Sequence, residues 1–137
     1  MRHCFGLRIY YEDTDAGGIV YHANYLRFAE RARTEWLRGI GFDHPTLLDR
    51  LGVMFAVRRC DATFFAPAKL DDEIYVETSH VRTQGARVHL DQVILRGEQR
   101  LVTVAVELVL VDRRLRPSRL PAELKGALGP PVPHDEC

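Results

Sequence analysis

The segment Asn-Tyr-Leu-Arg-Phe-Ala-Glu-Arg-Ala-Arg-Thr-Glu-Trp-Leu-Arg, residues 24–38, decides the fold, because its apolar side chains recur at helical spacing. Asn24 is a candidate N-cap of this helix, although His22 could begin the first turn. Gly39 and Gly41 follow as a stop, since glycine tolerates the left-handed backbone at a helix end. Another layer of the fold must cover the broad apolar stripe. Its members are Tyr25, Phe28, Ala29, Ala32 and Trp36, widened by Leu26, Leu37 and Ile40.

Predicted strands surround this helix in the sequence. Residues 7–11 alternate and are rich in β-forming side chains, which predicts a first strand ahead of the helix. After a short helical turn at residues 45–50, the pattern predicts four further strands, over residues 53–65, 73–81, 87–95 and 101–111. Their short connections favour antiparallel neighbours. The order predicts an α+β domain in which a five-stranded antiparallel sheet wraps around one long central helix.

The last predicted strand and the tail behind it complete the domain. Residues 101–111 are apolar at almost every position, which predicts burial on both faces, under the helix on one side and another layer or subunit on the other. The proline-containing tail, about residues 117–137, is expected to be a frayed extension. We therefore predict a single domain over residues 1–137 with its core at about 7–112.

Composition argues against several classes of protein. The 19 basic and 19 acidic residues give a net charge of zero, which provides no electrostatic footprint for nucleic acid or an anionic membrane. Cys4, Cys60 and Cys137 are far apart and predict neither a metal site nor a disulfide framework. The sequence shows no signal segment and no apolar run long enough to span a membrane. We expect a cytoplasmic protein without membrane insertion.

The chemistry is concentrated just before the helix. Residues 11–25 place three acids and the pair Gly17 and Gly18 ahead of it. A helix N-terminus offers unpaired N–H donors and a positive dipole end, and glycines let a loop backbone approach a ligand closely. A carboxylate beside such donors suits acyl hydrolysis, which needs a base or nucleophile next to an oxyanion site. The acids could equally cap the helix, and the spacing alone leaves both interpretations open.

The run YEDTDAGGIVYHANYLRFAERARTEW, residues 11–36, closely resembles the Tol–Pal-associated (YbgC-like) acyl-CoA thioesterases, which belong to the 4-hydroxybenzoyl-CoA thioesterase group of hot-dog proteins. The resemblance extends over residues 7 to about 112. It implies a hot-dog fold and places the family's active-site aspartate on Asp15. In this family the backbone N–H of one residue polarises the thioester carbonyl, and the resemblance implies that this residue is His22. It also implies a homodimer or homotetramer with ligand sites at subunit interfaces.

The resemblance and the chemistry together assign candidate roles. Asp15 either attacks the thioester carbonyl or activates a water. Asp13 is its nearest rival for this catalytic role. The alternative interpretation of Asp13, which the motif favours, is an acid that orders the loop or caps the helix. His22 could act through its backbone alone or through its imidazole as well. Gly18 and Tyr25 are candidate substrate-binding residues. Glu30 matches an acidic acyl-pocket position of a related enzyme class, although its position on the helix favours an exposed partner of Arg33.

Several alternatives stay open. Coenzyme A would be part of the substrate, and neither a separate cofactor nor a metal is expected. The acyl group could be short or aromatic, and an acyl carrier protein could replace coenzyme A as the carrier and partner. A hydratase or dehydratase, or a non-catalytic partner-binding protein, could use the same fold. Candidate cations for nucleotide phosphates are Arg58, Arg59, Arg82 and Arg87.

Overall fold

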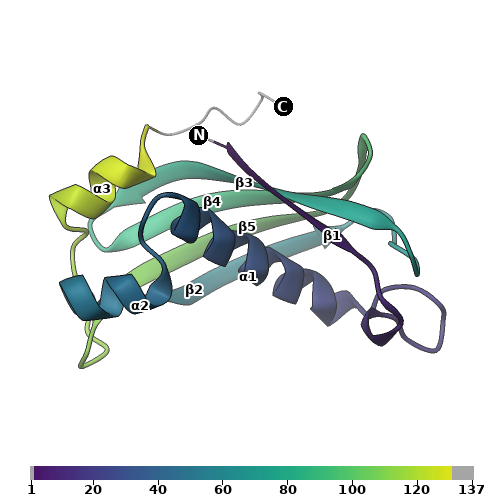
Figure 1. Ribbon diagram of the computed structural model, residues 1–137, viewed down its shortest axis with the longest axis horizontal. Coiled ribbons are helices and arrows are strands. Elements are labelled where there is room, and N and C mark those ends of the chain that lie inside the picture. Colours follow the sequence, from purple (N-terminus) through teal and green to yellow (C-terminus); the bar gives the residue numbers. More distant parts are fainter. Residues whose placement is uncertain (1, 131–137) are drawn as a thin grey trace.

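The computed structural model describes residues 2–130, and within them a curved antiparallel sheet wraps around the helix α1 (His22–Gly39) (Figure 1). The strand order is β1-β3-β4-β5-β2, so β1 and β2 form the two edges. This arrangement confirms the predicted α+β layout with a five-stranded sheet. The strands are β1 (Arg2–Arg8), β2 (Val53–Phe64), β3 (Glu73–Gln84), β4 (Arg87–Arg96) and β5 (Gln99–Asp112).

Helix α1 begins two residues before the segment that predicted it. Tyr21 is its N-cap and has extended backbone angles, so His22 is the first helical residue and Asn24 is not the cap. The Asn24 side chain instead donates a hydrogen bond to the backbone carbonyl of Asp13. At the other end Gly41 adopts a φ of 89°, which only glycine accepts readily. The stripe toward the sheet is buried as predicted at Tyr25, Phe28, Ala29, Ala32, Trp36 and Leu37.

The first strand lies earlier than predicted. Residues 7–11 were expected to be extended, but β1 ends at Arg8 and residues Tyr11–Asp13 form a short 3-10 turn. The Asp13 carboxylate accepts the Tyr10 N–H at 2.8 Å, and this local bond outweighs the β preference of the tyrosines. Pairing with β3 instead extends back to Arg2, opposite Ser79.

The tail is ordered where a frayed extension was expected, so that prediction is wrong for residues 117–130. Ser118 N–H donates to the Leu110 carbonyl, and the chain then forms α3 (Ala122–Leu128). Leu124 and Leu128 lie one helical turn apart and are both buried against the core. In Figure 1 α3 lies against one end of the sheet. The remaining tail residues, 131–137, which include Pro131, Pro133 and Cys137, lie outside the described residues.

Strand β5 is buried on the side of α1, as predicted, but only partly on the other. Val102, Val104 and Val106 pair with inward-facing residues of β4 and are buried. On the opposite side Thr103 is half-buried and Ala105 is exposed in the single chain. Short segments between α1 and β2, α2 (His44–Thr46) and a π-helical turn (Leu47–Leu51), close one end of the core.

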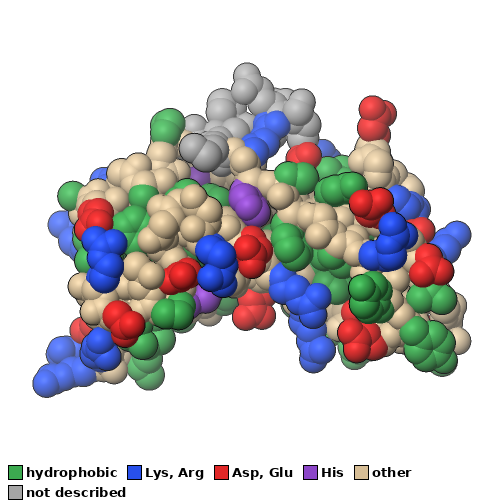
Figure 2. All heavy atoms as spheres, in the orientation of Figure 1, with side chains coloured by type: hydrophobic (Ala, Val, Ile, Leu, Met, Phe, Trp, Pro, Cys, Tyr) green, Lys and Arg blue, Asp and Glu red, His purple; other side chains and the backbone are tan. Residues whose placement is uncertain are grey.

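The described surface carries mixed charges. Basic and acidic side chains are interspersed on the face shown in Figure 2, in line with the net charge of zero. Within residues 2–130 there is no helix long and apolar enough to cross a membrane. The same residues contain no group of three or more side chains suited to hold a metal ion, and Cys4 and Cys60 are free thiols.

Candidate active site

The acidic segment folds into two turns between β1 and α1, and the first turn uses Asp13. Its carboxylate accepts the Tyr10 N–H. Its backbone carbonyl accepts the Tyr21 N–H at 3.1 Å and the Asn24 side-chain amide at 2.9 Å. These bonds connect the turn to the first residues of α1. Asp13 therefore orders the loop, as its alternative interpretation predicted.

The second turn presents Asp15 at the surface. The Asp15 N–H donates to the Ile19 carbonyl at 2.9 Å, and the Gly18 N–H donates to the Asp15 carbonyl at 3.0 Å. Gly18 has a φ of 78°, so this tight turn depends on glycine. The Gly17 N–H donates to Asp15 Oδ1 at 2.8 Å, and a side chain at Gly17 would stand 3.2 Å from the same oxygen. The turn therefore orients an exposed carboxylate.

An apolar hollow of roughly 300 Å³ opens beside this turn, at the N-terminus of α1. The imidazole of His22 lies edge-on to the Phe64 ring, with 6.3 Å between ring centroids. Phe64 is 49% exposed and Phe65 57% exposed, so two large apolar side chains at the end of β2 are left open to solvent. The hollow is lined by Ile19, Val20, His22, Tyr25, Phe64, Phe65, Ala66 and Pro67.

Tyr25 forms an inner wall of the hollow. Its ring is buried and packs edge-on against Phe28 and Phe64. Its hydroxyl accepts the backbone N–H of Ala68 at 2.9 Å. Burial raises the pKa of Tyr25, so the phenol is neutral at physiological pH. These contacts suit a structural wall better than a proton-transfer group.

The structure brings together some of the predicted site residues and separates others. Ile19 connects the Asp15 turn to the hollow that His22 and Tyr25 line, and Gly18 shapes that turn. Glu30 lies elsewhere, exposed on α1, and lines a separate groove between α1 and β1. This position favours its alternative interpretation as a surface residue over an acyl-pocket role.

Two of the four candidate phosphate-binding arginines contact a buried carboxylate, Glu107, on the opposite side of the sheet. Arg58 hydrogen-bonds to Glu107, and Arg87 and His89 lie within 3.7 Å and 3.3 Å of the same side chain. The Arg58 hydrogen bond is the main cause that holds the pKa of Glu107 below its usual value. These residues line a groove of roughly 500 Å³, together with Arg59 and Arg82. Glu107 thus offsets part of the positive charge there.

The sequence did not predict that the loop after β2 forms part of the wall of the hollow. Phe64 and Phe65 were assigned to a strand, and residues 67–72 were read only as a connection. In the structure this connection packs against the start of α1, because Val20 N–H donates to the Ala68 carbonyl at 3.0 Å. Two aromatic residues before a proline at a strand end were the available signal.

Comparison with known proteins identifies the family. Residues 10–128 match the family model described as the thioesterase-like superfamily. The chain belongs to the thioesterase-like superfamily. The acyl-CoA thioesterase YbgC of Haemophilus influenzae is 43% identical over 124 residues, which cover 90% of this chain and 91% of that protein. The acyl-CoA thioester hydrolase YbgC of Escherichia coli is 42% identical over 120 residues, 86% of this chain and 89% of that protein.

A solved structure agrees with the fold. A probable thioesterase from Bartonella henselae superposes with a TM-score of 0.85 at 42% identity, covering 88% of this chain and 100% of the other. These findings confirm the predicted hot-dog fold, the thioester hydrolase class and the resemblance to YbgC-like proteins. An association with the Tol–Pal system stays a prediction.

Proposed function

We propose that this protein hydrolyses acyl-CoA thioesters to a free acid and coenzyme A, with Asp15 as the essential carboxylate. The observation that carries the proposal is the Asp15 turn, which presents an exposed carboxylate and whose residue Ile19 lines an apolar hollow at the start of α1. The relatives named acyl-CoA thioesterases support the same substrate class. The aromatic lining and modest volume of the hollow favour a short or aromatic acyl group.

The N-terminus of α1 supplies a donor for the oxyanion. The first N–H groups of a helix have no partner within it. Among the backbone bonds of residues 2–130, the Tyr21 N–H donates to Asp13 and the Asn24 N–H to Tyr21, whereas the His22 N–H donates to no carbonyl. The His22 N–H is thus available to the thioester oxygen, aided by the helix dipole.

Asp15 has two chemically balanced routes to the products. As a general base it takes a proton from water, whose oxygen adds to the carbonyl, and the C–S bond then breaks to release the thiol of coenzyme A. As a nucleophile it forms a mixed anhydride with release of the thiol, and water then hydrolyses the anhydride. Neither route uses a metal or a separate cofactor.

The first test replaces the carboxylate. Asp15→Asn should lower kcat by at least about 100-fold, because the amide is neither a base nor an effective nucleophile. Thiol release from a series of acyl-CoA substrates measures the effect and also identifies the preferred acyl group. Glu12→Gln, an exposed acid in the same segment, is the matched control and should keep its activity. Near-normal turnover of folded Asp15→Asn would contradict the proposal.

We also propose a homodimer or homotetramer formed through the edge strand β2. A sheet edge exposes unpaired N–H and C=O groups that invite pairing with another strand. Val57 on this edge is 52% exposed, and Phe64 at its end borders the hollow. A second copy paired along β2 would cover both.

The free thiols of Cys4 and Cys60 support a reducing, cytoplasmic setting.

A further inference from the structure

Ala68, in the loop between β2 and β3, contacts the start of α1 at two points. It is completely buried. Its N–H donates to the Tyr25 hydroxyl at 2.9 Å, and its carbonyl accepts the Val20 N–H at 3.0 Å. Val20 lies two residues before His22 and Tyr25 three residues after it. A single loop residue therefore sets the position of the chain on both sides of the His22 N–H.

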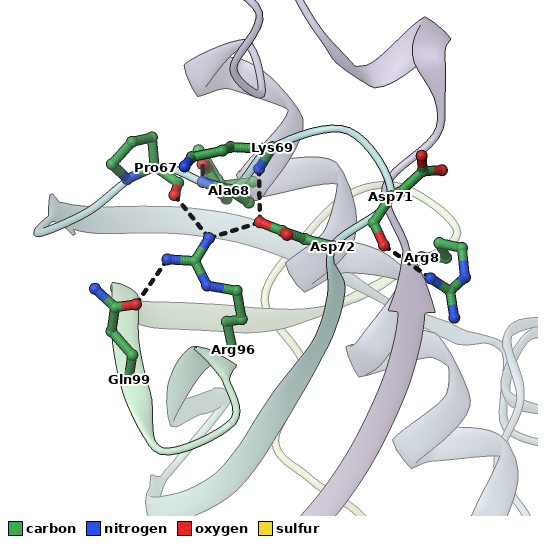
Figure 3. A network of polar contacts seen from close by, with 9 residues as sticks. Arg8, Pro67, Ala68, Lys69, Asp71, Asp72, Arg96 and Gln99 are labelled. Carbon is green, nitrogen blue, oxygen red and sulfur yellow. Dashed lines mark hydrogen bonds and ion pairs between the residues drawn. The ribbon is translucent and has the colours of Figure 1, made fainter.

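Arg96, the last residue of β4, holds that loop from the other side (Figure 3). Its Nη1 donates to Asp72 Oδ2 at 2.6 Å and to the Pro67 carbonyl at 3.3 Å. Asp72 Oδ2 also accepts the Lys69 N–H at 2.8 Å. The guanidinium thus contacts the residue before Ala68, and through Asp72 it reaches the residue after it.

The surroundings of this ion pair make it more rigid than an ordinary surface pair. The Arg96 and Asp72 side chains are only 30% and 23% exposed. Arg96 Nη2 also donates to Gln99 Oε1 at 2.7 Å, which orients the guanidinium plane. Charge-assisted bonds that are partly shielded from water are stronger and better oriented than exposed ones. Burial raises the pKa of Asp72, but the Lys69 N–H and Arg96 outweigh it, and the net pKa lies below the ordinary value.

We infer that Arg96 and Asp72 are positioning residues for thioester hydrolysis, acting through Ala68 on the His22 N–H and the wall of the hollow. The inference rests on the proposed Asp15 site, which shares the helix start with His22. A displacement of about 1 Å at reacting groups can lower a rate by about 100-fold, even when its cause lies outside the site. If the loop relaxes, the hollow can still bind the acyl group while the oxyanion donor loses its alignment.

The test compares Arg96→Gln, Arg96→Lys and a matched control. Arg50 provides the control, because it also forms a 2.6 Å ion pair, with Glu123. The Arg50 and Glu123 side chains are both about half exposed, and this pair lies away from the loop. Each variant is assayed for thiol release from acyl-CoA well below its melting temperature. Arg96→Gln should lower kcat by about 10-fold or more with little change in KM. Arg96→Lys should restore part of kcat, because an ammonium can still bind Asp72, and Arg50→Gln should keep wild-type kcat.

A second variant tests whether Tyr25 and Arg96 act through the same loop. Tyr25→Phe keeps the buried ring and removes only the hydroxyl that accepts the Ala68 N–H. If both residues act through one loop, the kcat losses of Tyr25→Phe and Arg96→Gln should be less than multiplicative in the double variant. A purely stabilising role would lower the melting temperature and leave kcat of the folded protein unchanged. Should Arg96→Gln not fold, Asp72→Asn replaces it in the same cycle.

The outcomes separate this inference from the proposed function. Wild-type kcat in folded Arg96→Gln, or fully multiplicative losses in the double variant, would overturn the positioning role. If Asp15→Asn is inactive in the same assay, the proposed Asp15 active site still stands. An active Asp15→Asn would overturn the site and, with it, this inference.

Discussion

At the residue scale, Asp13 and Asp15 stand two positions apart but meet different surroundings. Asp13 accepts the Tyr10 N–H through its side chain and the Tyr21 N–H through its carbonyl, so its polar groups are engaged in the loop. The Asp15 side chain accepts a local N–H, from Gly17, and its carboxylate stays at the surface. A carboxylate that must reach a thioester carbonyl needs this exposure. The geometry thus favours Asp15 where spacing left a choice.

A prediction at this scale concerns His22. His22→Ala should lower kcat only partially, by less than about 10-fold, because the backbone N–H remains at the first position of α1. Loss of an oxyanion donor itself costs about 100-fold or more. Thiol-release kinetics of His22→Ala and His22→Asn would measure the effect, with the exposed His44→Ala as control. A fall of about 100-fold in both His22 variants would show that the imidazole is essential.

At the scale of an element, His80 on β3 is buried beside the residue that follows α3. The backbone of Gly129, just after α3, and that of Arg82 lie beside this ring, and the imidazole Nε2 lies 2.8 Å from the Thr83 hydroxyl oxygen. Burial lowers the pKa of His80, and the backbone of Gly129 and Arg82 opposes the shift. Burial of the ring therefore favours a neutral imidazole.

This burial predicts a pH-dependent stability. A histidine with a lowered folded-state pKa binds fewer protons when folded, so its contribution is present above the unfolded value of about 6.5 and is lost as the pH falls below it. The free energy of unfolding, measured by urea titration, should therefore decrease from about pH 7.5 to about pH 5.5. His80→Gln should show a smaller decrease, and His44→Gln the same decrease as the wild type. An unchanged decrease in His80→Gln would contradict the prediction. The pKa of His89 is also lowered, chiefly by burial, so some pH dependence of the free energy of unfolding should remain in His80→Gln.

At the scale of the whole molecule, the open edge of β2 predicts self-association. Light scattering at micromolar concentration should give at least twice the 15.7 kDa mass of one chain. Val57→Lys should shift the protein toward the monomer, because a charged side chain on an edge strand opposes pairing. Leu115→Lys, at an exposed apolar residue outside the sheet, is the matched control and should leave the mass unchanged. A monomeric wild type would refute the dimer.

The sequence by itself predicted what depends on local pattern. Helix α1 follows from apolar residues at a spacing near 3.6, and β2 to β5 follow from extended runs separated by turn residues, so their existence and order were correct. The Asp-Thr-Asp-Ala-Gly-Gly run was recognisable because a tight glycine turn before a helix is also a local feature. The resemblance carried by the same run led to the superfamily that the comparison confirmed.

Only the tertiary structure decided what depends on residues far apart in the chain. The bounds of β1 were set by its pairing with β3, about 70 residues away. The docking of α3 depends on apolar space that the rest of the core provides. The bonds from Ala68 to Tyr25 and from Arg96 to Asp72 join segments separated by 43 and 24 residues. Such contacts leave no periodic trace, because a hydrogen bond between distant segments requires only that folding bring two polar atoms within about 3 Å.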